Sequence, residues 1–360
     1  SNLTVSRGGK TLAWVDNIAG ERNIFIATGD QFSSVYKLTE YVGDQGISLS
    51  NLEFTPDGYS LVYVRGNTKN RQGEAANPGL LDEDTGQAIF IHSLNNRKKI
   101  KISKGSMPSI SHDGSTIAFV KEGQIWTASL NDSISQPKKL FNIRGSQSDI
   151  NWSPNDNYLA FTSSRSDNSY IGVYSFKDMK VVFMDPSVDR DFSPEWSPNN
   201  KKVAFIRKPY AKDVPPFSPQ KSARPWSIRV INLSSNQSTS LWEADPGRGS
   251  AFFNQFPKAA LKWTIDNQII FPWEKNGWMH IYSLDVQSGN TSQLTYGDGI
   301  VEQYHLNKEN NYILYTTNVN DIHARHIGKI YLDSKKNVML TNGEGTEVSP
   351  LPVKKGFAFL

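Results

Sequence analysis

Glu274 is a candidate binding residue, because it stands in the run Trp273-Glu274-Lys275-Asn276-Gly277-Trp278, between two apolar segments. A buried ammonium group needs a carboxylate partner, so Glu274 could hold a substrate cation, with Trp278 in the same site. Glu274 could instead form an ion pair between neighbouring sheets, and we favour that structural interpretation.

Glu243 and Arg248 form a second candidate pair, because they flank a Pro-Gly turn. Arg248 lies between Gly247 and Gly249, and glycines allow a ligand to approach the backbone closely. The same glycines would serve any tight turn, so the alternative is a purely structural one.

Two long insertions hold the remaining candidates. The first runs from about residue 65 to 87 and contains Arg71 and Glu74; insertions of this kind often carry binding residues, although an ordinary surface loop is the favoured interpretation. The second runs from residue 207 to Arg224, which is itself a candidate substrate-binding residue, and is rich in proline, which suggests an extended, semi-rigid segment. It could form a lid edge or a docking surface, or be a simple excursion of the chain.

Four histidines raise the question of a metal site. His323 and His326 are three residues apart, a spacing that suits one face of a helix rather than a strand. With His280 and His305 they could hold a divalent ion, but we favour surface and loop histidines and predict no metal and no other cofactor. The chain has no cysteine, which excludes thiol nucleophiles and cysteine-bound zinc.

These residues must be positioned by a repeated element, because eight short apolar blocks, each ending in an aromatic residue, recur along the chain. Successive aromatic residues are 49, 56, 42, 44, 66, 44 and 44 residues apart, a period near 44 that is lengthened at the insertions. The blocks are Leu12-Ala13-Trp14, Leu61-Val62-Tyr63, Ile117-Ala118-Phe119, Leu159-Ala160-Phe161, Val203-Ala204-Phe205, Ile269-Ile270-Phe271, Ile313-Leu314-Tyr315 and Phe357-Ala358-Phe359.

Each period has room for four short strands separated by turns. A turn such as Thr55-Pro56-Asp57-Gly58 precedes the apolar block, and an aromatic or β-branched strand such as Ile24-Phe25-Ile26 follows it. This pattern predicts an all-β propeller of four-stranded blades over residues 1–360, with seven blades complete and an eighth truncated. Because the eighth unit stops after its first block, we expect the chain to be a fragment.

Composition excludes several classes of function. Basic and acidic residues number 39 and 35, giving a net charge of +4 without a basic stretch long enough to indicate nucleic acid. No run of about 18 apolar residues predicts a membrane span. The first strand is expected almost at once after Ser1, so either the protein has no export signal or this sequence begins after one.

The repeats resemble those of the TolB, oligogalacturonate lyase and prolyl oligopeptidase group. Within that group the chain is most similar to the amino-terminal propeller of dipeptidyl-peptidase-IV-like serine peptidases. The motifs that carry the resemblance are Arg190-Asp191-Phe192-Ser193-Pro194-Glu195-Trp196-Ser197-Pro198, Arg224-Pro225-Trp226-Ser227-Ile228, Phe271-Pro272-Trp273-Glu274-Lys275-Asn276-Gly277-Trp278-Met279-His280-Ile281-Tyr282 and Leu294-Thr295-Tyr296-Gly297-Asp298-Gly299-Ile300-Val301-Glu302.

The resemblance implies a division of labour with an α/β-hydrolase domain that carries the catalytic triad. This chain has no Gly-x-Ser-x-Gly elbow, so we expect it to be inactive alone and to gate and orient oligopeptide substrates for that partner domain. The family's dipeptidyl peptidases bind the substrate ammonium through adjacent glutamates, and no Glu-Glu pair occurs here, which argues against strict dipeptidase specificity. The resemblance further implies export to the periplasm, with a cytoplasmic location as the alternative, and a parent that could form homodimers. The alternatives are a TolB-like protein-binding scaffold and, less favoured, a metal-dependent oligosaccharide lyase.

Overall fold

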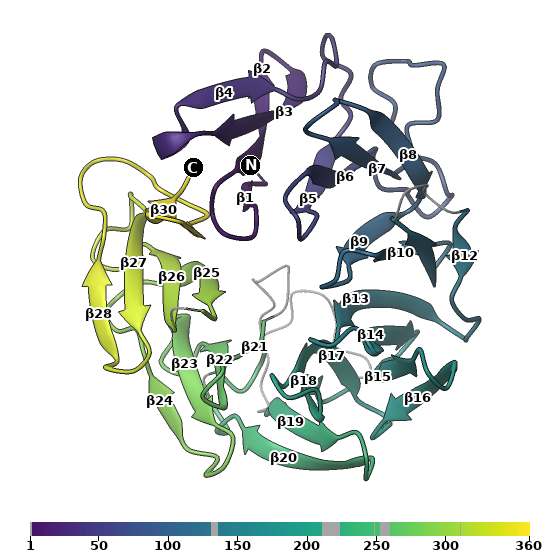
Figure 1. Ribbon diagram of the computed structural model, residues 1–360. Helices are drawn as coiled ribbons and strands as arrows, with labels where there is room; N and C mark the ends of the chain where they lie inside the picture. Colours follow the sequence, from purple (N-terminus) through teal and green to yellow (C-terminus); the bar gives the residue numbers. More distant parts are fainter. Residues whose placement is uncertain (1, 131–135, 211–223, 248, 253–259, 310) are drawn as a thin grey trace. The chain divides into compact units, whose positions relative to one another are not determined.

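A computed structural model describes residues 2–130, 136–210, 224–247, 249–252, 260–309 and 311–360 (Figure 1). Within these residues the chain forms thirty β-strands and one short 3-10 helix, Asp30–Phe32. It divides into two compact units, Ser1–Ile143 with Leu351–Leu360, and Arg144–Pro350, which we call unit 1 and unit 2. The prediction of a chain built almost entirely of strands is confirmed.

Unit 1 contains three four-stranded antiparallel sheets, in which consecutive strands of the chain are neighbours (Figure 1). The first consists of β1 (Thr4–Val5), β2 (Leu12–Ile18), β3 (Glu21–Thr28) and β4 (Ser34–Lys37). The second consists of β5 (Leu49–Phe54), β6 (Ser60–Arg65), β7 (Ala88–Ser93) and β8 (Lys99–Lys104). The third consists of β9 (Ser106–Ile110), β10 (Thr116–Lys121), β11 (Gln124–Ser129) and β12 (Lys138–Lys139).

The carboxyl-terminal residues add a two-stranded hairpin to unit 1. It comprises β29 (Leu351–Val353) and β30 (Gly356–Ala358), which pair in antiparallel fashion. The Lys354 amide donates a hydrogen bond of 3.0 Å to the Gly9 carbonyl in the turn between β1 and β2. Segments from the two ends of the sequence therefore meet within one unit.

Unit 2 contains one eight-stranded and two four-stranded sheets. The large sheet joins β13 (Ser146–Trp152), β14 (Tyr158–Arg165), β15 (Asn168–Ser175) and β16 (Lys180–Met184) to β17 (Arg190–Trp196), β18 (Lys202–Lys208), β19 (Ser227–Asn232) and β20 (Gln237–Glu243). The next sheet comprises β21 (Lys262–Trp263), β22 (Gln268–Trp273), β23 (His280–Asp285) and β24 (Thr291–Gln293). The last comprises β25 (Val301–Asn307), β26 (Tyr312–Thr317), β27 (His326–Tyr331) and β28 (Lys336–Met339).

The predicted fold class is confirmed at the level of an all-β propeller built from four-stranded blades. The predicted seven complete blades and truncated eighth blade are not all seen as separate sheets. The described residues form five four-stranded sheets, one eight-stranded sheet and the terminal hairpin. In the eight-stranded sheet a single parallel pair, Ser169 with Arg190, connects β15 to β17. The Ser169 hydroxyl also donates a hydrogen bond of 2.7 Å to the Asp191 carbonyl, which reinforces this junction.

Charged side chains strengthen the same junction. The Arg207 guanidinium on β18 donates to both carboxylate oxygens of Asp191 on β17, over 2.7 and 2.8 Å. Arg207 also binds the carboxylate of Asp185, in the segment after β16, at 3.1 Å. Arg229 on β19 binds the Asp185 carboxylate as well, at 3.1 Å. Because Asp191 is fully buried, these paired groups satisfy charges that would be costly to bury alone.

Local sequence explains the repeated turns between the first and second strands. In the Thr55 turn the threonine hydroxyl donates to the Asp57 carboxylate at 2.6 Å and accepts the Ser60 amide at 3.1 Å. Ser111, Ser153 and Ser197 make the corresponding bond to Asp113, Asn155 and Asn199. The hydroxyl and the short acceptor two residues later therefore close the same turn in four blades.

The aromatic residues of the first seven apolar blocks all lie in the second strand of a four-strand set, namely in β2, β6, β10, β14, β18, β22 and β26. Alternate residues of these strands pack in different directions, since strand side chains point to opposite faces. On β6, Leu61 and Tyr63 join a core with β2 and β3, whereas Val62 and Val64 join one with β10. Both faces of such a strand are buried, which is why its sequence is continuously apolar.

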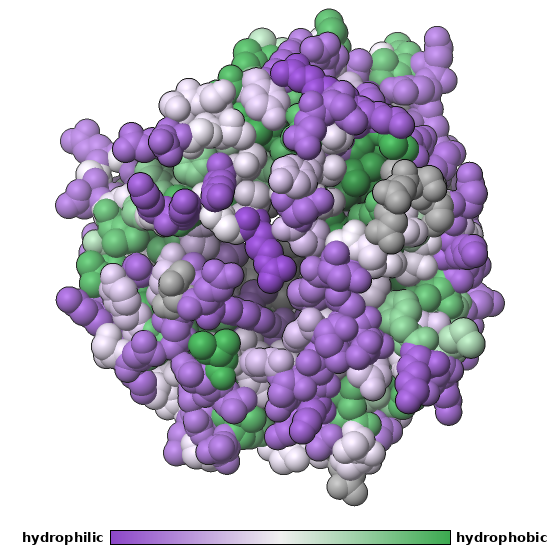
Figure 2. All heavy atoms as spheres, in the orientation of Figure 1, coloured by the Kyte–Doolittle hydropathy of each residue, from purple (hydrophilic) through white to green (hydrophobic). Residues whose placement is uncertain are grey.

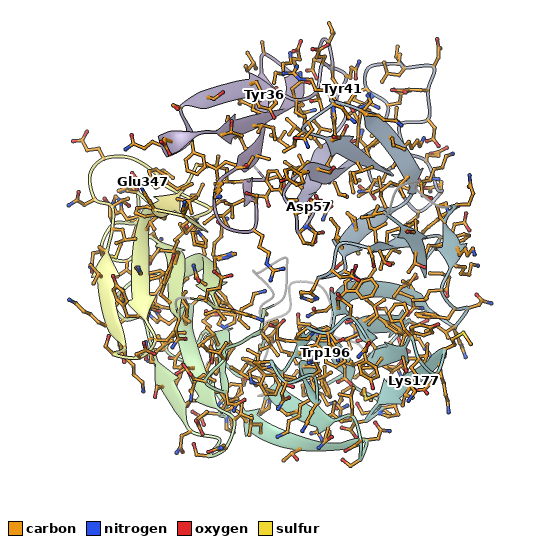
Figure 3. The ribbon with its side chains drawn as sticks, in the orientation of Figure 1. Tyr36, Tyr41, Asp57, Lys177, Trp196 and Glu347 are labelled. Carbon is orange, nitrogen blue, oxygen red and sulfur yellow. The ribbon has the colours of Figure 1, made fainter. Side chains whose placement is uncertain are left out.

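Polar side chains also join the blades of unit 2 along their first strands. Trp196 on β17, labelled in Figure 3, donates its indole hydrogen to the Asn151 carbonyl on β13 at 3.0 Å. The buried Glu195 carboxylate accepts hydrogen bonds from the Trp263 amide on β21 at 3.3 Å and from the Lys308 ammonium at 3.2 Å.

Hydrophilic residues predominate on the face drawn in Figure 2, where the hydrophobic residues form smaller separate patches.

Candidate functional site

The Gly249 carbonyl is the hydrogen-bonding centre of the candidate site in unit 2. The Trp273 indole, at the end of β22, donates to it at 3.0 Å, and the Trp226 indole, just before β19, donates at 3.2 Å. Gly249 has a φ of 76°, and a Cβ atom added there would lie 2.5 Å from the Glu274 carbonyl oxygen. Only glycine therefore fits, and the segment containing it lies against the start of the Glu274 loop.

A wall of aromatic side chains holds these two indoles in place. Trp242 packs against Trp226 and Trp273, with ring centroids 4.8 Å apart in both pairs. Phe252 contacts Trp226 at 4.8 Å, and Phe271 contacts Trp242 at 4.9 Å. Most of these contacts are edge-to-face, an arrangement that adds stability beyond the buried area.

Glu274 is the first residue after β22 and is partly buried. Burial raises the pKa of its carboxyl group, because removal from water disfavours the charged form. Its side chain makes no hydrogen bond or ion pair to any residue that the structure describes, so the favoured interpretation as an inter-blade ion pair is not supported within those residues. Its neighbour Lys275 is paired instead, with Asp245 at 3.3 Å. Trp278, in the same loop, is 40% exposed.

Two basic residues contact the segment that follows Gly249. The Arg224 backbone amide donates to the Ser250 hydroxyl at 3.4 Å, and the Lys208 side-chain ammonium donates to the Phe252 carbonyl at 3.4 Å. Burial lowers the pKa of Lys208, and the positive charges of Arg190 and Arg224 lower it further.

The backbone of Glu274, whose carboxyl group is partly desolvated, therefore lies against Gly249, and the Lys208 ammonium lies against Phe252 of the same segment, residues 249–252. A carboxylate of this kind can bind an ammonium group, and the cations can bind carbonyl or carboxylate oxygens, so the pair suits the polar ends of a peptide. Sequence reasoning identified Glu274 and Arg224 but missed Lys208. Lys208 is the last residue of β18, the strand that leads into the second insertion, and this position is the one sequence feature that could have indicated it.

The other predicted residues lie elsewhere or outside the described residues. Glu243 is exposed on β20, in register with Ser227, and Arg248 falls outside the residues that the structure describes. Arg71 and Glu74 are exposed in unit 1, where the Glu74 carboxylate accepts a 3.1 Å hydrogen bond from the Asn70 amide. Their proposed contact with substrate stays a prediction.

The histidines have separate partners. His280 is buried and bonds through its ring to the Thr295 hydroxyl and the Gly297 carbonyl, at 3.1 and 3.2 Å. His326 contacts the Glu347 carboxylate at 3.1 Å, and His323 lies in an exposed turn. Among the described residues, no three histidine or acidic side chains come close enough to hold a metal ion together.

Residues 228–356 match the family model of the dipeptidyl peptidase IV N-terminal region. No curated protein matches the chain in sequence. None of the described residues forms a helix that could cross a membrane.

Similar folds occur in solved peptidase structures. Porphyromonas gingivalis dipeptidyl peptidase 4 is similar over 98% of this chain and 54% of its own length, with a TM-score of 0.67 and 14% identity. A prolyl endopeptidase is similar over 94% of this chain and 49% of its own, with a TM-score of 0.65 and 10% identity. TolB from Acinetobacter baumannii reaches a TM-score of only 0.42 at 16% identity, covering 79% of this chain and 62% of its own.

The chain thus spans about half the length of the two peptidases. The Trp273–Trp278 run, which is part of one of the motifs that carry the resemblance, lies inside the matched residues. The chain is therefore confirmed as similar to the dipeptidyl peptidase IV N-terminal region, by the family match over residues 228–356 and by its propeller fold beyond them.

Proposed function

We propose that this chain is the non-catalytic propeller domain of a prolyl-oligopeptidase or dipeptidyl-peptidase type of serine peptidase. Its role is to admit oligopeptides and orient them for an α/β-hydrolase domain of the same parent protein. The observation that carries the proposal is the family match over residues 228–356, which contain the Glu274 loop. The blade structure and the similarity of fold to two peptidases give additional support.

Within this proposal, residues 1–360 act as one propeller domain. We count the two antiparallel sets of the eight-stranded sheet, β13 to β16 and β17 to β20, as two blades, because among the described residues Ser169–Arg190 is the single β-ladder pair between them. With the five four-stranded sheets, these two sets make seven complete blades, and the β29–β30 hairpin is the start of an eighth. We further propose a periplasmic parent that could act as a homodimer, in keeping with the family resemblance.

In the proposed substrate complex, Glu274 binds the amino terminus of the peptide. Its carboxylate is partly desolvated and lacks a partner among the described residues. It can therefore bind an ammonium group without first breaking a hydrogen bond to one of those residues. Lys208 and Arg224 would bind backbone carbonyl oxygens further along the peptide. Arg71, Glu74, Glu243 and Arg248 stay candidates for additional contacts.

The test uses the intact parent protein and pairs of peptides that differ only in acetylation of the amino terminus. Glu274→Gln is expected to lower kcat/KM for the free peptide by about ten- to hundredfold, the loss of one charge-assisted hydrogen bond, and to leave the acetylated peptide unaffected. Glu344→Gln, at an exposed position, serves as the matched control. An equal effect of Glu274→Gln on both peptides would refute the role of Glu274.

A separate result would refute the function itself. An intact parent without a Gly-x-Ser-x-Gly segment, or without peptidase activity, would contradict the proposal and favour a protein-binding scaffold. The two failures are distinguishable, because the second is seen without any substitution.

A further inference from the structure

Two positive charges lie opposite each other where β17 begins and β18 ends. Arg190 and Lys208 form the first pair of residues in the ladder between these neighbouring strands (Figure 1), and we call them the Arg190–Lys208 rung. Opposite residues of an antiparallel pair point to the same face of the sheet, and like charges in that position destabilise it. The next rung is matched, since Asp191 lies opposite Arg207 and accepts its hydrogen bond at 2.7 Å.

The blade architecture does not require a charged rung at this position. The corresponding first rungs of two other blades in unit 2 are uncharged, with Ser146 opposite Ser164 and Val301 opposite Thr317. A residue pair that breaks a local rule of stability is expected where the residues serve function instead. A negatively charged ligand is the simplest function for two adjacent cations.

Both side chains of the rung keep free hydrogen-bond donors. The Arg190 Nε donates to the Asp167 backbone carbonyl at 3.0 Å, and the Lys208 ammonium donates to the Phe252 backbone carbonyl at 3.4 Å. A guanidinium carries five N–H donors and an ammonium three, so most of the donors stay available to a ligand. Arg190 is exposed and Lys208 only partly buried, so a ligand can reach them from solvent.

The carboxylates near the rung in sequence are engaged elsewhere. Asp185 and Asp191 both bind Arg207, and Asp189 accepts a backbone amide at 3.1 Å. Within the part of the chain that the structure describes, no ion pair involves either cation of the rung. Burial, and then the charges of Arg190 and Arg224, lower the pKa of Lys208, as expected for a cation without a counter-ion.

The rung lies within reach of a peptide bound at Glu274. The Glu274 backbone contacts Gly249, and Lys208 contacts Phe252, three residues further along the same segment. Three steps between Cα atoms cover at most about 11 Å, and an extended peptide covers that distance in about three residues. A peptide with its amino terminus at Glu274 can therefore place its third, fourth or fifth residue at the rung.

We propose that the Arg190–Lys208 rung binds the carboxylate of an acidic side chain near the amino terminus of the substrate. This inference rests on the function proposed above, because it names the substrate class that the same site accepts. The Arg190 guanidinium can bind both carboxylate oxygens through parallel hydrogen bonds. Lys208, which has a further donor for a backbone carbonyl oxygen, supplies the second positive charge. The preferred substrates are then oligopeptides with glutamate or aspartate at the third to fifth position.

Calorimetric titration of the whole chain tests the rung with alanine hexapeptides that carry one glutamate or one glutamine at position three, four or five. All peptides have a free amino terminus and an amidated carboxyl terminus, so the glutamate side chain is the only carboxylate. At the best position, the glutamate peptide is expected to bind about ten- to hundredfold more tightly than the glutamine peptide, as expected for charge-assisted hydrogen bonds. Arg190→Gln should reduce this preference to nearly one.

The matched control is Lys177→Gln, which should keep the preference. Lys177, labelled in Figure 3, is an exposed lysine of unit 2 in the turn between β15 and β16. Arg190→Gln should unfold at a temperature no lower than the unaltered chain, because it removes repulsion between like charges. A loss of preference in Arg190→Gln is then a loss of binding contacts and not of the fold.

Each outcome decides the proposal. A glutamate preference that Arg190→Gln abolishes and Lys177→Gln preserves supports it. No binding of the glutamate peptides, equal binding of glutamate and glutamine peptides, or a preference that survives Arg190→Gln overturns it. If the free-acid form of the glutamine peptide binds more tightly than its amide while glutamate gives no preference, the rung binds the carboxyl terminus instead, and the acidic side chain is the wrong ligand.

Failure of this inference is distinguishable from failure of the proposed function. The preference is measured as binding to this chain, so it does not depend on a hydrolase domain. A parent without peptidase activity refutes the proposed function and leaves the binding measurement valid. A parent that cleaves glutamate and glutamine peptides with equal kcat/KM, and whose propeller binds them equally, refutes the inference alone.

Discussion

Substitution of Gly249 by alanine tests whether this glycine holds the candidate site together. Its φ of 76° lies in the left-handed region, where a side chain is strained. An added methyl group would also lie 2.5 Å from the Glu274 carbonyl oxygen and 2.8 Å from the Trp273 indole nitrogen. One methyl group therefore introduces two separate costs, one in the backbone and one in the packing.

Gly8 provides the reference for the backbone cost alone. It has a φ of 89° in the turn after β1, and a methyl group added there would meet nothing within 4 Å. The left-handed conformation costs a non-glycine residue about 1–2 kcal/mol, which is the whole expected effect of Gly8→Ala. Overpacking adds about 1–3 kcal/mol, so Gly249→Ala should lower the free energy of unfolding by about 2–5 kcal/mol.

Chemical denaturation followed by tryptophan fluorescence measures both changes, and near-ultraviolet circular dichroism reports the surroundings of Trp226 and Trp273. Gly249→Ala is expected to alter the dichroism as well as the midpoint, because both indoles donate to the Gly249 carbonyl. If Gly249→Ala costs no more than Gly8→Ala and leaves the dichroism unchanged, the proposed packing of the Gly249 segment against the Glu274 loop is wrong.

Two further predictions concern stability. Burial lowers the pKa of His305 from 6.5 to about 4, so its contribution to stability is fully present above pH 6.5 and is lost as the pH falls toward 4. Between pH 7 and pH 5 this loss of unfolding free energy amounts to about 2 kcal/mol. His305→Gln should remove this pH dependence, whereas the control His323→Gln, at an exposed position, should retain it. If the stability of His305→Gln varies with pH as that of the unaltered chain does, the prediction is wrong. Trp273→Phe should cost about 1 kcal/mol more than Trp263→Phe in denaturation, because Trp263, although also buried, has no hydrogen-bond partner for its indole in the described residues. Equal costs would show that the bond to Gly249 adds nothing.

Much of the blade architecture could be predicted because it depends on contacts between residues close in sequence. Phe161 and Phe205 lie in second strands, as their apolar blocks indicated, since a strand with two buried faces must be continuously apolar. The turn at Ser153 follows from a hydroxyl and an acceptor two residues apart. In each case the few residues of the motif contain both partners of the interaction.

The grouping of blades into sheets could not be predicted in the same way. The eight-stranded sheet depends on the pairing of Ser169 with Arg190 and on Asp185, which binds Arg207 and Arg229 at once. These partners are more than twenty residues apart, and no spacing in the sequence indicates which of the many charged residues will meet. Pairing at that distance is decided by how the strands twist and pack.

The sequence by itself determined the repeat, the strand order within each blade and the resemblance to the dipeptidyl peptidase IV N-terminal region, since all three are written in local patterns of apolar, aromatic and turn residues. Tertiary structure alone decided which candidates share a site. It placed the backbone of Glu274 against Gly249 and brought Lys208 to the same segment. The reason is physical: burial and the distance between charges depend on neighbours that the fold brings together from distant parts of the chain.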